Sequence, residues 1–111
     1  FDVNSIALLF GYRLLQNPEM IDYLIETQQE GKNFTLKSLE KQNYECRDCR
    51  GNYILIRTKL PPKEVEERLM AKKILIKTYN NELLKSYIRV SIGSRKAMSF
   101  FLNAFYDVDS V

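Results

Sequence analysis

The fold of this chain is decided by one stretch of sequence, Tyr87-Ile88-Arg89-Val90-Ser91-Ile92-Gly93-Ser94. Its apolar residues predict a β-strand, and Gly93-Ser94 predicts a turn into a helix that Ser94 caps. One charged residue, Arg89, stands inside this apolar strand. Because burying a guanidinium group costs free energy unless it meets an anion, we interpret Arg89 as a functional residue.

Outward from this strand, the spacing of apolar residues and prolines predicts the other elements. We expect helices over 5–16, 18–41 and 62–72 and after Ser94, and strands over 44–46, 52–59 and 74–76. Asn17-Pro18 separates the first two helices, and Gly31 is a candidate for a bend in the second. The residues expected to face inward are Met20, Tyr23, Leu24, Phe34, Leu36 and Leu39 in the second helix, Val65, Leu69 and Met70 in the third, and Ala97, Phe100, Phe101, Ala104 and Phe105 in the last.

The order of these elements predicts the fold class. Residues 53–56 are all largely apolar, so the strand over 52–59 should be buried on both faces or nearly so. Strands and helices together indicate an α+β fold, in which helices cover a small, mainly antiparallel sheet of about four strands. The 111 residues, 45% of them hydrophobic, suit a single domain.

Composition excludes several classes of function. The net charge of +3, from 17 basic and 14 acidic residues, is spread along the chain and gives no argument for a nucleic-acid partner. Apolar runs fall far short of the roughly 20 residues that a membrane span needs. The start resembles no signal peptide and lacks Met, so we expect a fragment of a cytoplasmic protein.

The two cysteines form a Cys-x-x-Cys pair, Cys46 and Cys49. This spacing suits half of a zinc site or a redox pair, although the chain has no histidine to complete a metal site. A redox pair is expected at the start of a helix, whereas here a glycine and a strand-like run follow. The other reading is a pair of reduced turn thiols, and we expect neither metal binding nor redox function.

Three segments resemble the C-terminal small domain of fold-type I, class I/II aminotransferases, closest to the branch of histidinol-phosphate aminotransferase and threonine-phosphate decarboxylase. They are Asn52-Tyr53-Ile54-Leu55-Ile56-Arg57, Ile74-Leu75-Ile76-Lys77 and the stretch from Tyr87 to Ser94, and they follow one another in the family's order. The opening Val3-Asn4-Ser5 with Ala7 is similar to the segment that begins the family's long connecting helix, here 1–16.

The resemblance implies roles for particular residues. Arg89 falls where the family's arginine grips the substrate's carboxylate or phosphate, which suits a planar fork of donors held on a rigid strand. Lys77 falls where relatives often carry an arginine that helps to bind a phosphorylated substrate, and here it could equally be a surface lysine. Asn52 and Asn4 match positions near the active-site cleft, or they act as a turn former and a helix cap.

The resemblance also implies a parent enzyme, a transaminase that uses pyridoxal 5'-phosphate. Its Schiff-base lysine, its pyridine-binding aspartate and its cofactor-phosphate site would all lie upstream of Phe1. This segment is therefore expected to anchor a small-molecule substrate, to bind no cofactor, to hold no catalytic residue and to be incompetent alone. Its expected partners are the large domain of the same chain and, in the parent, a second copy in a homodimer.

Two readings of other classes remain. A stand-alone α+β module could use Tyr53, Tyr79 and Tyr87 to stack on single-stranded RNA, although the chain lacks the glycine-rich aromatic strand signatures of such modules. A domain descended from the enzyme could serve only as an interaction or regulatory module for a protein partner. A cofactor-binding α/β domain encoded upstream would favour the enzyme over both.

Overall fold

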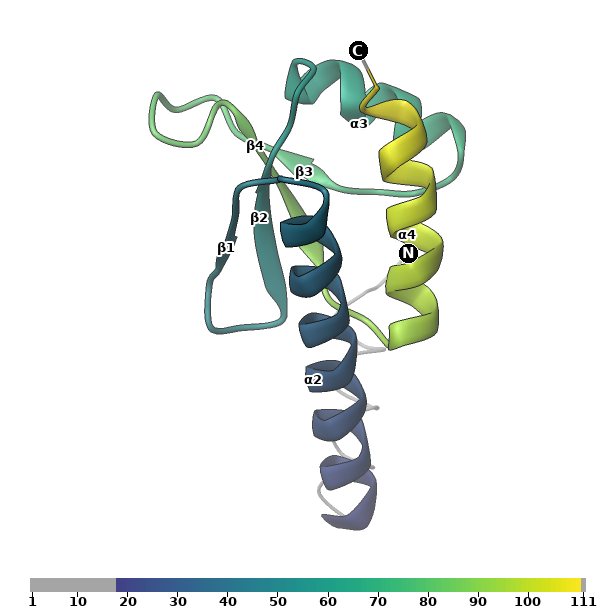
Figure 1. Cartoon of the computed structure of the whole chain (residues 1–111). Coiled ribbons are helices and arrows are strands. Elements are labelled where there is room, and N and C mark those ends of the chain that lie inside the picture. The colour runs from purple at the N-terminus through teal and green to yellow at the C-terminus, as the bar shows by residue number, and fades with distance from the viewer. Residues whose placement is uncertain (1–17, 111) are drawn as a thin grey trace, which may run out of the picture.

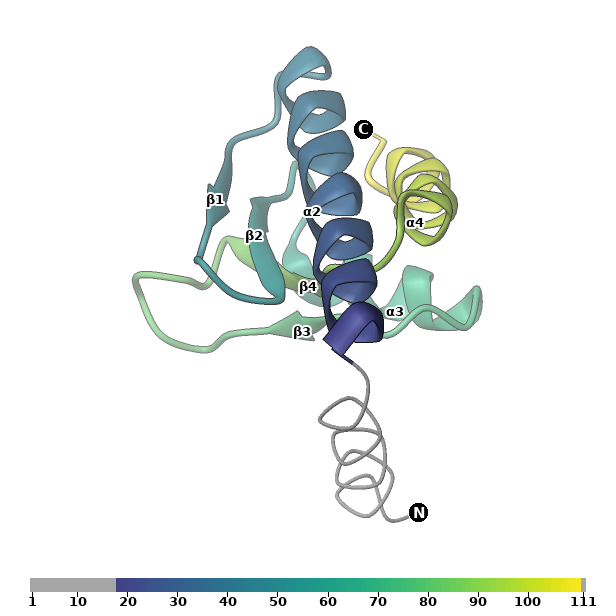
Figure 2. The ribbon, with the colours of Figure 1, turned by 90° about the horizontal axis from the view of Figure 1, so that it is seen from below.

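The computed structural model describes residues 18–110, so the expected helix over 1–16 and Asn4 lie outside the described residues. The described elements follow in the order α2 (Pro18–Lys41), β1 (Cys46–Asp48), β2 (Tyr53–Arg57), α3 (Pro62–Ala71), β3 (Lys77–Thr78), β4 (Tyr87–Ser91) and α4 (Arg95–Val108). Three helices lie on one side of a four-stranded antiparallel sheet (Figures 1 and 2). The predicted α+β class is confirmed.

Helix α2 begins at Pro18 and ends at Lys41, as predicted. Proline suits the first position of a helix because its missing N–H would have no partner there. Gly31 does not interrupt the helix. It is buried, and a Cβ atom at this position would lie 1.9 Å from the carbonyl oxygen of Gly93. Glycine therefore lets α2 approach the backbone between β4 and α4 closely.

The sheet has the strand order β1-β2-β4-β3. Strand β2 confirms the prediction of burial on both faces, since Ile54, Leu55 and Ile56 are all buried. Two predicted strands were misplaced, because β1 covers Cys46–Asp48 in place of 44–46 and β3 covers Lys77–Thr78 in place of 74–76.

Both errors have the same physical cause at a helix end. Asn43 and Lys73 adopt left-handed backbone conformations, with φ of 61° and 65°. The next N–H groups, of Tyr44 and Ile74, then donate back to the carbonyls of Leu39 and Leu69 at 2.9 Å. These bonds are those of the Schellman motif that closes helices. They hold the residues expected to begin each strand against the preceding helix.

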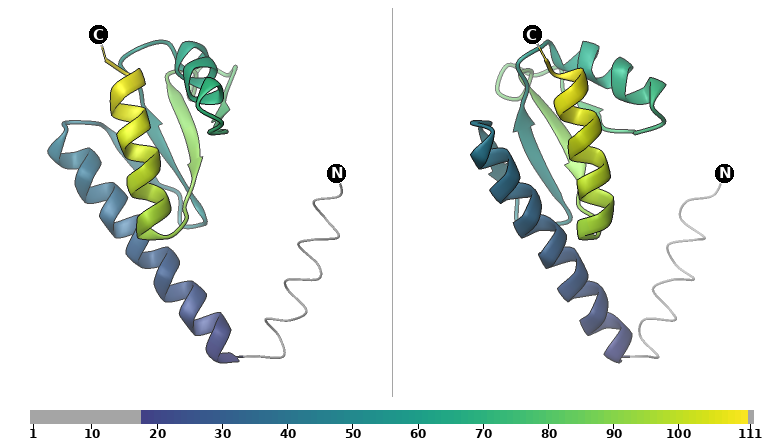
Figure 3. Two further views of the ribbon diagram at one scale, coloured as in Figure 1. Left: turned by 90° about the vertical axis from the view of Figure 1, so that its right-hand side faces the viewer. Right: turned by 45° about the vertical axis from the view of Figure 1, so that its right-hand side comes forward.

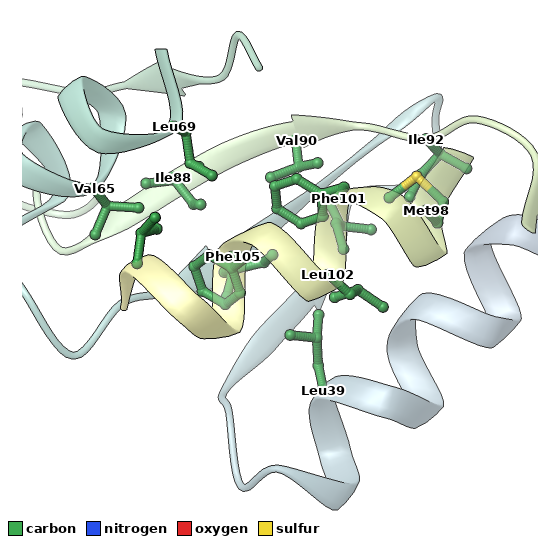
Figure 4. Close-up of a cluster of buried hydrophobic side chains, with 13 residues drawn as sticks. Leu39, Val65, Leu69, Ile88, Val90, Ile92, Met98, Phe101, Leu102 and Phe105 are labelled. Carbon is green, nitrogen blue, oxygen red and sulfur yellow. The ribbon is translucent and has the colours of Figure 1, made fainter. Parts of the chain in front are cut away.

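The core lies between the sheet and the helices. Ile54 and Ile56 of β2 and Ile88 and Val90 of β4 point toward α3 and α4, and Figure 4 shows the side chains of β4 meeting those of the helices. The buried members of this cluster are Leu39, Ile54, Ile56, Val65, Leu69, Ile88, Val90, Ile92, Met98, Phe101, Leu102, Phe105 and Val108.

Five residues expected inside are exposed: Met20, Tyr23, Met70, Ala97 and Phe100. Met20 and Tyr23 lie on the first half of α2, which projects past the sheet and α4 (Figure 3). Phe100 is 66% exposed, because the buried residues of α4 form a stripe through positions 98, 101, 102, 105 and 108 that leaves position 100 to one side. Met70 is exposed because it follows the buried Leu69 by about 100° around α3.

A buried carboxylate fixes the end of α4. Asp109 accepts hydrogen bonds from the backbone N–H groups of Lys59 and Leu60, both at 2.9 Å, and from the Tyr44 hydroxyl at 2.7 Å. Burial and the neighbouring Asp109 raise the pKa of Tyr44, so its hydroxyl stays protonated and donates. Nothing in the sequence pattern singled out Asp109.

No helix within residues 18–110 is both long and apolar enough to cross a membrane.

Candidate functional site

One row of side chains crosses the four strands on the face that no described helix covers. Arg47 is paired with Leu55, Leu55 with Arg89, and Arg89 with Lys77, and residues paired across antiparallel strands share a face of the sheet. We call this surface the helix-free face; its strand residues are Arg47, Tyr53, Leu55, Arg57, Lys77, Tyr87, Arg89 and Ser91. The sheet register therefore brings Arg89 and Lys77 together, and it adds Arg47 to the same row.

Arg89 is partly buried and lies over an aromatic ring. Its guanidinium carbon is 4.4 Å from the centroid of the Tyr53 ring. Among residues 18–110, Arg89 forms no ion pair. The strand alternation turns Arg89 away from Ile88 and Val90, so it meets the ring on the helix-free face and is not enclosed by those apolar neighbours.

Lys77 is exposed on the edge strand β3. It also forms no ion pair within the described part of the chain. Its ammonium group is a compact charge on a flexible stem, whereas the Arg89 guanidinium offers a planar fork of donors. Two neighbouring cations of these kinds, without a carboxylate partner, are suited to bind an external anion.

Next to this row, a second group of charges on the same face is already paired. Glu45 accepts a hydrogen bond from the Tyr87 hydroxyl at 2.5 Å and lies 3.7 Å from the Arg57 guanidinium. The hydrogen bond from Tyr87, and then the charges of Arg57 and Arg47, lower the pKa of Glu45 and keep it ionised at neutral pH. The Arg47 guanidinium lies over the Tyr87 ring, 5.3 Å from its centroid. Sequence reasoning assigned no role to these residues.

Asn52 is placed apart from Arg89 and Lys77. Its backbone carbonyl accepts a hydrogen bond of 2.6 Å from the N–H of Ile92, which extends the pairing of β2 with β4. Its exposed side chain lines a groove of about 480 Å³ between the β1–β2 hairpin and α2, together with Gln28 and Lys32. The structure thus gives Asn52 a place at the end of the sheet, near the helix.

The remaining candidates from the sequence have simple surroundings. Ser94 caps α4, as predicted, because its hydroxyl accepts the N–H of Ala97 at 3.2 Å. Cys46 and Cys49 are both free thiols. Burial and the neighbouring Glu40 raise the pKa of Cys46, which disfavours its thiolate. Within residues 18–110, no three His, Cys, Asp or Glu side chains gather at distances that suit a metal ion.

Comparison of the sequence with known proteins finds relatives of this chain. The chain is 29% identical over 97 residues to the histidinol-phosphate aminotransferase of Clostridium novyi, covering 86% of this chain and 27% of that protein. Over all 111 residues it is 22% identical to histidinol-phosphate aminotransferase 3 of Rhizobium meliloti, of which it covers 30%. No protein-family model matches the chain.

Solved structures have the same fold. A provisionally assigned histidinol-phosphate aminotransferase from Erwinia carotovora superimposes on 84% of this chain with a TM-score of 0.74 at 17% identity. A provisionally assigned aminotransferase from Burkholderia pseudomallei gives 0.74 at 19% identity. The chain spans less than a third of the length of these relatives and structures. By sequence the chain is similar to a segment of histidinol-phosphate aminotransferases, and its fold matches a segment of solved aminotransferase structures, which is consistent with the C-terminal small domain of the class I/II aminotransferases.

Proposed function

We propose that this chain is the substrate-anchoring C-terminal domain of a pyridoxal-phosphate-dependent aminotransferase that acts on an amino acid or a phosphorylated amino compound. The observation that carries this proposal is the pairing of Arg89 with Lys77 on the helix-free face, where neither cation has a carboxylate partner among residues 18–110. A rigid strand supplies the orientation, and the two positive charges supply the attraction for an anionic group of the substrate.

The pair favours a phosphorylated substrate within this class. A phosphate group carries up to two charges and several acceptor oxygens, so it can use the Arg89 fork and the Lys77 ammonium together. A carboxylate needs only the fork. The names of the relatives, which refer to histidinol phosphate, support the same choice for the parent protein.

The described residues do not fit the cofactor itself. Every described lysine is exposed except Lys32, and Lys32 is ion paired with Asp48. A Schiff-base lysine needs a desolvated or charge-tuned environment to become a nucleophile. The cofactor supplies the electron sink of the transamination when it is bound, and we assign its binding to the rest of the parent protein. On this account the chain is not competent alone.

The rest of the parent also explains the exposed start of α2. Met20, Tyr23 and Ile25 are exposed there, which supports contact with a large partner domain of the same chain. Closure of such a domain pair would bring Arg89 over a substrate held on the other domain. A cytoplasmic homodimer is the proposed setting of the parent.

The RNA-binding alternative has less support from the helix-free face. Tyr87 is only 5% exposed, and Arg89 covers one face of the partly buried Tyr53 ring, so these two rings offer little surface on which a base could stack.

A substrate panel tests the proposal on the intact parent protein. Amino donors of similar size that carry a phosphate, a carboxylate or neither would be compared by kcat/KM. We expect strong preference for an anionic donor, and Lys77→Ala should weaken use of the phosphorylated donor more than use of the carboxylate donor. Equal kcat/KM for charged and neutral donors would contradict the proposal.

A further inference from the structure

We propose that Tyr53 is a positioning residue for Arg89: its ring orients the guanidinium so that the edge of the fork stays free for the substrate anion. This inference rests on the proposed function of Arg89. Tyr53 belongs to β2 and Arg89 to β4, and their contact depends on the sheet register. Tyr53 is paired with Ser91, two residues beyond the pair of Leu55 with Arg89, so the two side chains are diagonal neighbours on one face.

The contact between the ring and the guanidinium is short. The distance of 4.4 Å compares with 4.9, 5.0 and 5.3 Å for the other cation–ring contacts among the described residues. Both side chains are partly buried, so the contact is partly removed from water. Cation–π attraction is stronger where water is excluded.

An aromatic partner leaves the donors of Arg89 available. The Tyr53 ring attracts the guanidinium through its π face and has no carboxylate oxygens, whereas a carboxylate would occupy the N–H groups of the fork. The contrast lies on the same sheet, where Glu45 engages Arg57 directly. Tyr53 can therefore hold Arg89 in place without using the groups that bind an anion.

The charge of Lys77 makes such support useful. Lys77 is the cross-strand partner of Arg89, and two like charges side by side repel each other. Without a substrate anion between them, this repulsion favours rotamers that turn the guanidinium away from Lys77. Tyr53 belongs to β2, on the side of β4 away from β3, so its ring receives the guanidinium there and holds it in one orientation, which lowers the ordering cost of binding.

Steady-state kinetics of the intact parent protein with L-histidinol phosphate tests the proposal. Tyr53→Leu should lower kcat/KM by about 3- to 30-fold, mainly through a higher KM, as expected from the loss of a cation–π contact. Tyr53→Phe keeps the ring and should stay within about twofold of the wild type. In an Arg89→Ala background, Tyr53→Leu should cause no further loss, because the group that it positions is absent.

A matched control uses the contact between Phe34 of α2 and Arg95 of α4, in which the guanidinium carbon lies 5.0 Å from the centroid of the ring. Phe34→Leu removes a similar contact away from the helix-free face and should leave KM unchanged. Tyr53→Ile, a good strand former, repeats the test if Tyr53→Leu folds poorly. Melting temperatures of all variants separate a kinetic effect from a loss of structure.

The outcomes separate this inference from the proposed function. If Arg89→Ala raises KM but Tyr53→Leu and Tyr53→Ile do not, the positioning role is refuted and the anchoring role stands. If Tyr53→Phe is as damaging as Tyr53→Leu, the hydroxyl and not the ring acts, and the inference is wrong. If Arg89→Ala itself leaves KM unchanged, the anchoring role fails and the inference fails with it.

Discussion

Replacing Gly31 by alanine should destabilise the chain, although the same change inside a helix ordinarily stabilises it. In a helix interior, alanine favours the helical state by about 1 kcal/mol relative to glycine. At Gly31, however, the new Cβ atom would lie 1.9 Å from the Gly93 carbonyl oxygen and 3.0 Å from two further backbone atoms. These neighbours belong to the backbone and have no rotamer into which to move.

The size of the effect follows from the displacement that is needed. Ordinary contact begins at 3.4 Å, so α2 and the Gly93 backbone must separate by about 1.5 Å. Forcing extra atoms into packed regions typically costs about 1–3 kcal/mol, and backbone contacts lie at the upper end. After the gain in helix propensity, we expect a net loss of about 2 kcal/mol in the free energy of unfolding.

Urea unfolding of the 111-residue chain, followed by circular dichroism, measures this loss. With a slope of about 1–2 kcal/mol/M, the midpoint should fall by roughly 1–2 M. Gly51→Ala is the matched control, because a Cβ there has no contact closer than 3.9 Å and the residue has no positive φ. It should stay within about 0.5 kcal/mol of the wild type. A Gly31→Ala chain as stable as the wild type would refute the close approach of α2 to Gly93.

Two further predictions concern Asp109 and the cysteines. Asp109→Asn should lower the free energy of unfolding by about 2–3 kcal/mol in the same urea assay. Both carboxylate oxygens of Asp109 accept backbone N–H groups, those of Lys59 and Leu60, whereas an asparagine side chain has only one oxygen that can accept. An unchanged midpoint would show that the carboxylate does not hold the end of α4. Replacing both Cys46 and Cys49 by serine should lower the free energy of unfolding by less than about 1 kcal/mol, and metal analysis should find no stoichiometric zinc in the unchanged chain. Zinc that the serine variant loses together with stability would show a metal site.

Element boundaries that depend on local chemistry were predictable. Pro18 and Pro62 start α2 and α3, and Ser94 caps α4, because proline and serine act on their own helix end. The left-handed residues Asn43 and Lys73, which follow α2 and α3, were not predictable, since neither position carries the glycine that usually marks such a cap. The strands that follow these residues were misplaced for this reason.

The candidate site was only partly visible in the sequence. Arg89 could be singled out because it is a charge within an apolar strand, and Lys77 through the resemblance to the family. The contact between Arg89 and Tyr53 depends on the register of β2 against β4, and the 35 residues between Tyr53 and Arg89 place it outside local pattern reasoning. The Asp109 carboxylate likewise meets Lys59 and Leu60 only after the chain has folded.

The most direct test of the central claim is kcat/KM of the intact parent protein with its anionic substrate when Arg89 becomes lysine. The change keeps the charge but removes the planar fork, so kcat/KM should fall by roughly tenfold to several hundredfold. Arg57→Lys, on the same face but ion paired with Glu45, should remain within about twofold. Full kcat/KM in Arg89→Lys would make Arg89 a structural residue and would contradict the account.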